Sequence, residues 1–170
     1  AFFRDDQLNA ADFIQKRVAT IQDVLVEVGP SGLSLISGAS DLLSAANLKH
    51  AQKVRVMNHI RGLDVDVVLI DLGAGTTFNI LDFFLMSDMS ILAVVPEPTS
   101  IENGYRFIKS ALYRRLRAVA QTESLRELVD SALDPKNPQG IKTPAELVAR
   151  VESEEPETGR MLRREMSTFQ

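Results

Sequence analysis

One short stretch near the middle of the chain constrains the fold more than any other. Val67 to Ile70 form an uninterrupted apolar run, and a carboxylate, Asp71, follows it directly. A run of this length and mostly β-branched composition is typical of a strand that is buried on both faces, as in the centre of a parallel sheet. We therefore expect a central strand that ends at Asp71.

The residues after Asp71 suit a turn that could accept an anion. Gly73 and Gly75 tolerate positive φ, and the small neighbours Ala74, Thr76 and Thr77 let backbone N–H groups approach a ligand. Apolar residues then recur at helical spacing, at Ile80, Leu81, Phe84 and Leu85. A strand, a glycine-rich turn and a helix in this order describe the carboxyl edge of a parallel sheet, where α/β proteins bind phosphate and metal.

Three functional interpretations of this turn compete. A dinucleotide-binding fingerprint is excluded, because Phe78 stands where the third Gly or Ala belongs. A phosphate-binding P-loop is excluded, because none of the nine glycines is followed by lysine. The third is the acidic element of a P-loop enzyme, in which Asp71 holds Mg²⁺ through water and a glycine N–H senses the γ-phosphate. An ordinary β-to-α turn explains the same residues about equally well.

Two further apolar runs extend the prediction to a sheet. Leu33 to Ile36 read as a strand, and Ser90 to Val95 as a third buried strand that Pro96 closes. A helix is expected from about Leu48 to Arg61, ended by Gly62, whereas residues 24–28 fit a strand or a helix equally well. Helical connectors between apolar strands predict an α/β fold with a three-layer parallel sheet core.

The rest of the chain reads as helical. A long helix is expected over 101–120, capped by Thr99 or Ser100, and further helices over 123–133, from Thr143 through Val151, and over 153–170. We expect residues 1–120 to form a partial α/β nucleotide-binding core, and residues 121–170 to form an all-helical extension of the same domain.

The helix over 101–120 has a basic face interleaved with aromatic residues. Its cations are Arg106, Lys109, Arg114, Arg115 and Arg117, and it carries no acid after Glu102. Such a face can meet an anionic membrane surface or an acidic protein partner. The alternative interpretation, arginine stems packed along the helix with solvated heads, is favoured at roughly two to one on such a signal.

Composition excludes several classes of site. The 170 residues contain no cysteine and two histidines, nine positions apart, so thiolate metal sites and thiol nucleophiles are excluded. The net charge of −4 gives no strong signal for nucleic-acid binding. Lack of cysteine suits a reducing cytoplasm, and we expect a cytoplasmic protein whose intact form can associate with membrane. Phe2 and Phe3 lie in a predicted loop and the last residues lack a helix stop signal, so we expect the middle portion of a longer protein.

The motifs VVLIDLGAGTT and ILAVVPEPTSIENGYRFIKSALYRRL, at their spacing, resemble the MinD/ParA family of P-loop ATPases, in particular the branch that includes the flagellar-number regulator FlhG. The resemblance covers roughly residues 33–116. It implies an ATP- and Mg²⁺-dependent switch protein for cellular positioning or flagellar-number control, and a homodimer that ATP favours and hydrolysis releases.

The resemblance also implies roles for individual residues. Asp71 would be the catalytic residue, an aspartate that orients the water shell of Mg²⁺, and the nucleotide would lie against Gly73, Gly75, Thr76, Pro96 and Glu97. The two lysines of the family's phosphate-binding loop have no counterpart in this sequence. Without them little neutralises a triphosphate, so we expect this chain alone to be inactive. The alternative is a non-catalytic protein-interaction module that uses the basic helix over 101–120.

Overall fold

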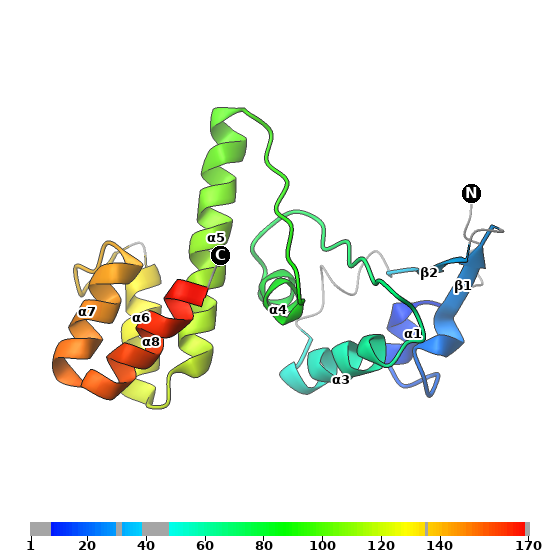
Figure 1. The fold of residues 1–170 in the computed structure, drawn as a ribbon, viewed down its shortest axis with the longest axis horizontal. Coiled ribbons are helices and arrows are strands. Elements are labelled where there is room, and N and C mark those ends of the chain that lie inside the picture. The colour runs from blue at the N-terminus through cyan, green and yellow to red at the C-terminus, as the bar shows by residue number, and fades with distance from the viewer. Residues whose placement is uncertain (1–7, 30–31, 39–47, 135, 169–170) are drawn as a thin grey trace. The chain divides into compact units, whose positions relative to one another are not determined.

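The computed structural model describes residues 8–29, 32–38, 48–134 and 136–168. The chain divides into two compact units, Ala1–Met86 and Ser87–Gln170. The expected exposure of Phe2 and Phe3 lies outside the described residues. Each unit has its own apolar core, and the described part of the chain is mostly helical (Figure 1).

The first unit contains short helices and one hairpin. Its elements are α1 (Ala10–Ile14), the 3₁₀ turn η1 (Gln22–Val24), β1 (Leu25–Val28), β2 (Leu33–Ile36), α3 (His50–Arg61) and α4 (Phe78–Met86). The helix expected over 48–61 is confirmed, and Gly62 ends it by donating its N–H to the carbonyls of Asn58 and His59. The core gathers Phe13, Ile14, Ile21, Val24, Leu48, Val56, Met57 and Phe83.

The predicted three-layer parallel sheet is wrong. The described residues form one two-stranded sheet, in which β1 and β2 pair antiparallel with Leu25 opposite Ile36 and Val28 opposite Leu33. The connection between them is only a few residues long, and a short connection favours an antiparallel hairpin, whereas parallel strands need a crossover of a dozen residues or more.

The two apolar runs expected to be buried strands are not strands of the described sheet. Residues 67–70 and 90–95 belong to no ladder of the described chain, and Val67 and Leu69 are 74% and 88% exposed. Ile91 is 80% exposed. The composition of these two runs favours an extended backbone. A ladder also requires a neighbouring strand, and none of the described residues supplies one.

Asp12 ties the start of α1 to its neighbours. Asn9 donates its N–H to Asp12 Oδ2 at 2.9 Å and accepts the N–H of Ala11 on its own side chain, and Arg17 Nη1 lies 3.0 Å from Asp12 Oδ1. The hydrogen bond from the Asn9 backbone, and after it the hydrogen bond from the Arg17 side chain, lower the pKa of Asp12 below its usual value.

Because of these contacts of Asp12, we expect the first unit to have a lower free energy of unfolding in acid. A carboxyl whose pKa is lower in the folded state stabilises the fold above its unfolded-state pKa, and that stabilisation is lost as the pH falls through the folded-state pKa. A pH series of unfolding curves with and without Asp12→Asn checks this. The variant should lose part of the acid sensitivity of the wild type; identical curves would contradict the expectation.

The second unit is a bundle of four helices, α5 (Pro98–Val119), α6 (Glu123–Leu133), α7 (Pro144–Glu154) and α8 (Pro156–Thr168) (Figure 1). The helices expected over 101–120 and 123–133 are confirmed. The cap predicted for α5 at Thr99 or Ser100 is wrong: Glu97 is the N-cap and Pro98 takes the first turn, where its fixed φ suits a helix.

Only the second half of α5 enters the core of this bundle. The core is formed by Tyr113, Leu116, Ala120, Leu125, Val129, Ala132, Ile141, Leu147, Val148, Val151 and Leu162. The first half of α5 extends beyond the other three helices (Figure 1), and Ile101 and Tyr105 on it are 56% and 69% exposed. The bundle therefore presents a projecting arm, made of the start of α5 and the segment that leads into it.

Candidate functional site

The glycine turn over 71–77 and the helix after it are present as the sequence predicts, but the parallel-sheet edge expected at this turn is not among the described residues. Asp71 is exposed, and its Oδ1 accepts the N–H of Gly73 at 3.3 Å. Gly73 has φ +67° and Gly75 has φ +115°, so both adopt backbone conformations that L side chains rarely take. A Cβ at Gly73 would meet no atom within 4 Å, so the requirement for glycine there is conformational and leaves the space beside the backbone open.

The turn leads directly into the start of α4. The carbonyl of Thr77 accepts the N–H of Leu81 at 3.0 Å, and the Thr77 hydroxyl is 3.5 Å from the N–H of Ile80. The N-terminal end of a helix carries a partial positive charge. Asp71 and the two glycines thus precede a helix end that favours negative charge, as a phosphate site requires.

A buried ion pair fixes α4 within the first unit. Lys53 Nζ on α3 lies 2.5 Å from Asp82 Oδ2 on α4, and the two side chains are 4% and 15% exposed. A buried pair of this kind holds two helices in one register, because separating the charges leaves one of them unpaired in an apolar surrounding. Lys53 and Asp82 therefore position α4, and with it the turn that precedes α4.

Sequence reasoning missed this pair. The signal that was available is the position of Lys53, three and four residues before Val56 and Met57, which form the buried face of α3. A lysine on the apolar face of a helix needs a carboxylate partner, and Asp82 on α4 is that partner.

The six predicted site residues divide between the two units. Asp71, Gly73, Gly75 and Thr76 lie together in one exposed turn of the first unit. Pro96 and Glu97 belong to the second unit, where Glu97 begins α5 and donates its N–H to the carbonyl of Val95 at 2.8 Å. Asp71 in the first unit and Glu97 in the second unit are both exposed carboxylates.

The described residues contain no group of three or more His, Asp or Glu side chains arranged to hold a metal ion. Asp71 thus offers a single carboxylate, the donor expected where Mg²⁺ keeps most of its water and takes further oxygens from a nucleotide. A cation that has lost its water ligands must instead be bound directly by several side chains, and this turn does not have them.

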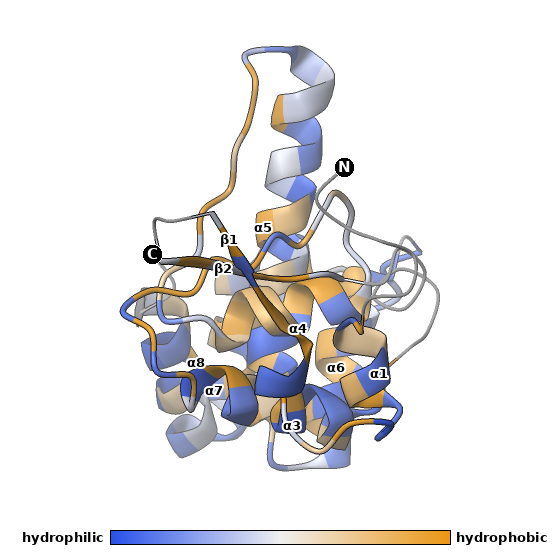
Figure 2. Cartoon of the chain, turned by 90° about the vertical axis from the view of Figure 1, so that its right-hand side faces the viewer, coloured by the Kyte–Doolittle hydropathy of each residue, from blue (hydrophilic) through white to orange (hydrophobic). Residues whose placement is uncertain are grey.

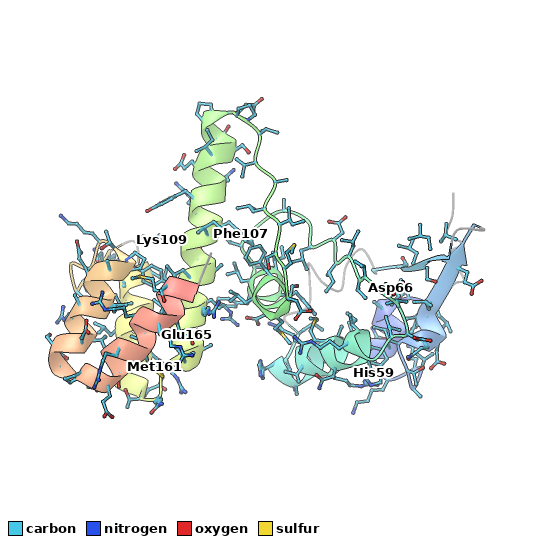
Figure 3. The ribbon with its side chains drawn as sticks, viewed as in Figure 1. His59, Asp66, Phe107, Lys109, Met161 and Glu165 are labelled. Carbon is cyan, nitrogen blue, oxygen red and sulfur yellow. The ribbon has the colours of Figure 1, made fainter. Side chains whose placement is uncertain are left out.

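Four of the cations on the basic face of α5 contact other side chains of the bundle, two of them acids on neighbouring helices. Arg115 Nε lies 2.8 Å from Glu165 Oε2 on α8, and Figure 3 labels Glu165. Arg117 Nε contacts both carboxylate oxygens of Asp130 on α6, at 2.8 and 3.0 Å. Arg106 pairs with Glu102 one turn earlier, and Lys109 Nζ lies 5.8 Å from the centre of the Tyr113 ring. These contacts favour the interpretation of this face as part of the bundle's own packing.

No family model, curated protein or solved structure matches the chain. Among the described residues, no helix combines the length and apolarity that crossing a bilayer requires. The geometry of the turn over 71–77 and the two motifs therefore carry the functional argument.

Proposed function

We propose that this chain contributes the magnesium-orienting aspartate and the γ-phosphate-sensing turn of an ATP-dependent switch protein of the MinD/ParA type. The observation that carries the proposal is the turn itself: an exposed Asp71, two glycines at positive φ, and the N-terminus of α4 in direct succession. Carboxylate oxygen is a preferred ligand of hydrated Mg²⁺, and helix N-termini with glycine-rich turns bind phosphate.

The chain's own residues would act by position and charge. The Asp71 carboxylate orients a water of the Mg²⁺ shell, and backbone N–H groups of the turn donate to phosphate oxygens. Because the turn is joined directly to α4, a phosphate that reorders Gly75 can shift the start of that helix. With no lysine beside these glycines, charge neutralisation is weak, so weak binding without turnover is expected of this chain alone.

A titration with Mg²⁺·ATP tests the proposal. Amide NMR signals of Gly73, Gly75 and Thr76 should shift on addition of Mg²⁺·ATP, and Asp71→Asn should abolish the shifts because the neutral amide cannot hold the hydrated cation.

Asp66→Asn is the matched control, since Asp66 is an exposed carboxylate of the same extended segment, labelled in Figure 3. Its shifts should equal those of the wild type. Signals of the turn that stay unchanged at saturating Mg²⁺·ATP would contradict the proposal. Asp71-dependent turnover would overturn only the expectation that the chain is inactive alone.

A further inference from the structure

Asn103 is the one asparagine of the chain that a glycine follows. The sequence contains six asparagines, and the residues after the other five are alanine, leucine, histidine, isoleucine and proline. An asparagine before glycine is the pair most prone to deamidation, because glycine has no side chain to hinder ring closure and its backbone adopts conformations that other residues rarely take. The sequence therefore marks Asn103 and Gly104 as a candidate site of chemical modification.

The reaction needs only these two residues and water. The backbone nitrogen of Gly104 attacks the side-chain carbonyl carbon of Asn103, the new carbon–nitrogen bond closes a succinimide ring, and the side-chain nitrogen leaves as ammonia. Water then opens the ring at either of its carbonyls and gives aspartate or isoaspartate. In total, water is consumed, ammonia is released and the chain gains a negative charge. No partner molecule, nucleotide or metal takes part, so the reaction is independent of Asp71 and of the function proposed above.

The position of the pair in α5 sets how readily the ring can close. In a regular helix each backbone N–H bonds to the carbonyl four residues earlier, which holds the nitrogen away from the preceding side chain, so the helix must first open locally. Asn103 is exposed and lies in the first half of α5, which extends beyond the other three helices of the bundle in both views (Figure 1, Figure 2). Gly104 lowers the helix propensity there. This half of α5 should therefore open at a lower free energy than the helices of the bundle core.

We propose that Asn103 deamidates spontaneously in the folded chain, through local opening of the first half of α5, and that the isoaspartate formed ends the helix at this point. Isoaspartate directs the main chain through its side-chain carbon and so adds a methylene group to the backbone. The helical hydrogen-bond pattern cannot continue across such a residue. The helical residues before it, 98–102, are too few to hold a helix alone, so α5 of the modified chain begins after Gly104.

Gly159 in α8 offers a matched site in the same unit. Thr158 precedes it near the start of the helix, so Thr158→Asn creates a second asparagine–glycine pair. A Cβ at Gly159 would lie 2.3 Å from the Cα of Glu152, so at this glycine α8 is packed directly against the backbone of α7. The asparagine of Thr158→Asn should therefore react more slowly than Asn103 by about tenfold or more, because local opening there also separates two packed helices.

Peptide mass spectrometry of the Thr158→Asn chain, incubated at mildly alkaline pH, tests the proposal. In concentrated urea the two asparagine–glycine pairs should react at the same rate, because no helix protects either of them. In native buffer Asn103 should gain the mass of deamidation first. Gly104→Ala should remove this gain, because the alanine side chain hinders ring closure and alanine favours the helix.

The modified wild-type chain tests the structural consequence. Its added negative charge separates it from the unmodified chain by ion exchange, and the isoaspartate form should show a smaller helical circular dichroism signal than the unmodified chain. An Asn103 that stays intact in native buffer, equal native rates at the two asparagine–glycine pairs, or an isoaspartate form with an unchanged helical signal would overturn the proposal.

Discussion

Replacing Gly159 by alanine is expected to destabilise the second unit by about 3 kcal/mol, the upper range for overpacking a close contact. Gly159 lies in α8, where an added Cβ would be 2.3 Å from the Cα, 2.4 Å from the Cβ and 2.6 Å from the backbone nitrogen of Glu152 in α7. Because these are largely backbone atoms, rotation of a side chain cannot relieve the overlap. The two helices must separate, and the packing around Leu147, Val148 and Leu162 loosens with them.

Gly104→Ala is the matched control within the same unit. The Cβ added there would meet only side-chain atoms, the nearest at 3.0 Å, and an alanine in a helix interior gains about 1 kcal/mol over glycine. The free energies of unfolding of both variants, from urea titrations followed by circular dichroism, should therefore differ by several kcal/mol. Equal stabilities would show that α7 and α8 do not approach as closely as described.

The second large effect is expected at the ion pair that joins α3 to α4. Asp82→Ala should destabilise the first unit by about 3 kcal/mol, because it leaves the Lys53 ammonium buried without a carboxylate. The free energy of unfolding measured in urea checks the magnitude, and the amide spectrum of the turn over 71–77 should change with it, because α4 is no longer held.

Two comparisons separate the cost of an unpaired charge from other effects. The double variant Lys53→Met/Asp82→Leu removes both charges and should recover most of the lost stability. Glu102→Ala breaks an exposed ion pair, in which the Arg106 side chain is 68% exposed and the Glu102 side chain 58%. This change should alter the free energy of unfolding by less than about 1 kcal/mol. If Asp82→Ala costs no more than Glu102→Ala, Lys53 is not buried as described.

The local features of the fold could be predicted from sequence, because each is set by neighbouring residues. Gly62 ends α3, and the Thr143 hydroxyl accepts the N–H of Glu146 at the start of α7, as spacing and capping chemistry predict. The turn after Asp71 was predictable for the same reason, since Gly73 donates its N–H to the Asp71 carboxylate two residues earlier.

Contacts between residues distant in sequence could not be predicted. The apolar runs over 67–70 and 90–95 indicate an extended backbone, but which strand lies beside them depends on partners elsewhere, and the predicted sheet was wrong for that reason. Lys53 and Asp82 are 29 residues apart, and Arg115 meets Glu165 at a separation of 50. Glu165 and Asp130, which pair with Arg115 and Arg117, were missed because they lie on other helices.

The most direct test of the central claim, that the turn over 71–77 holds a magnesium-bound triphosphate, is paramagnetic broadening with Mn²⁺ in place of Mg²⁺. Mn²⁺ takes the same oxygen ligands and broadens amide signals close to it. With Mn²⁺·ATP, we predict selective broadening at Gly73, Gly75 and Thr76 that Asp71→Asn removes. Broadening centred on Asp64 and Asp66, or broadening that persists in Asp71→Asn, would contradict the claim.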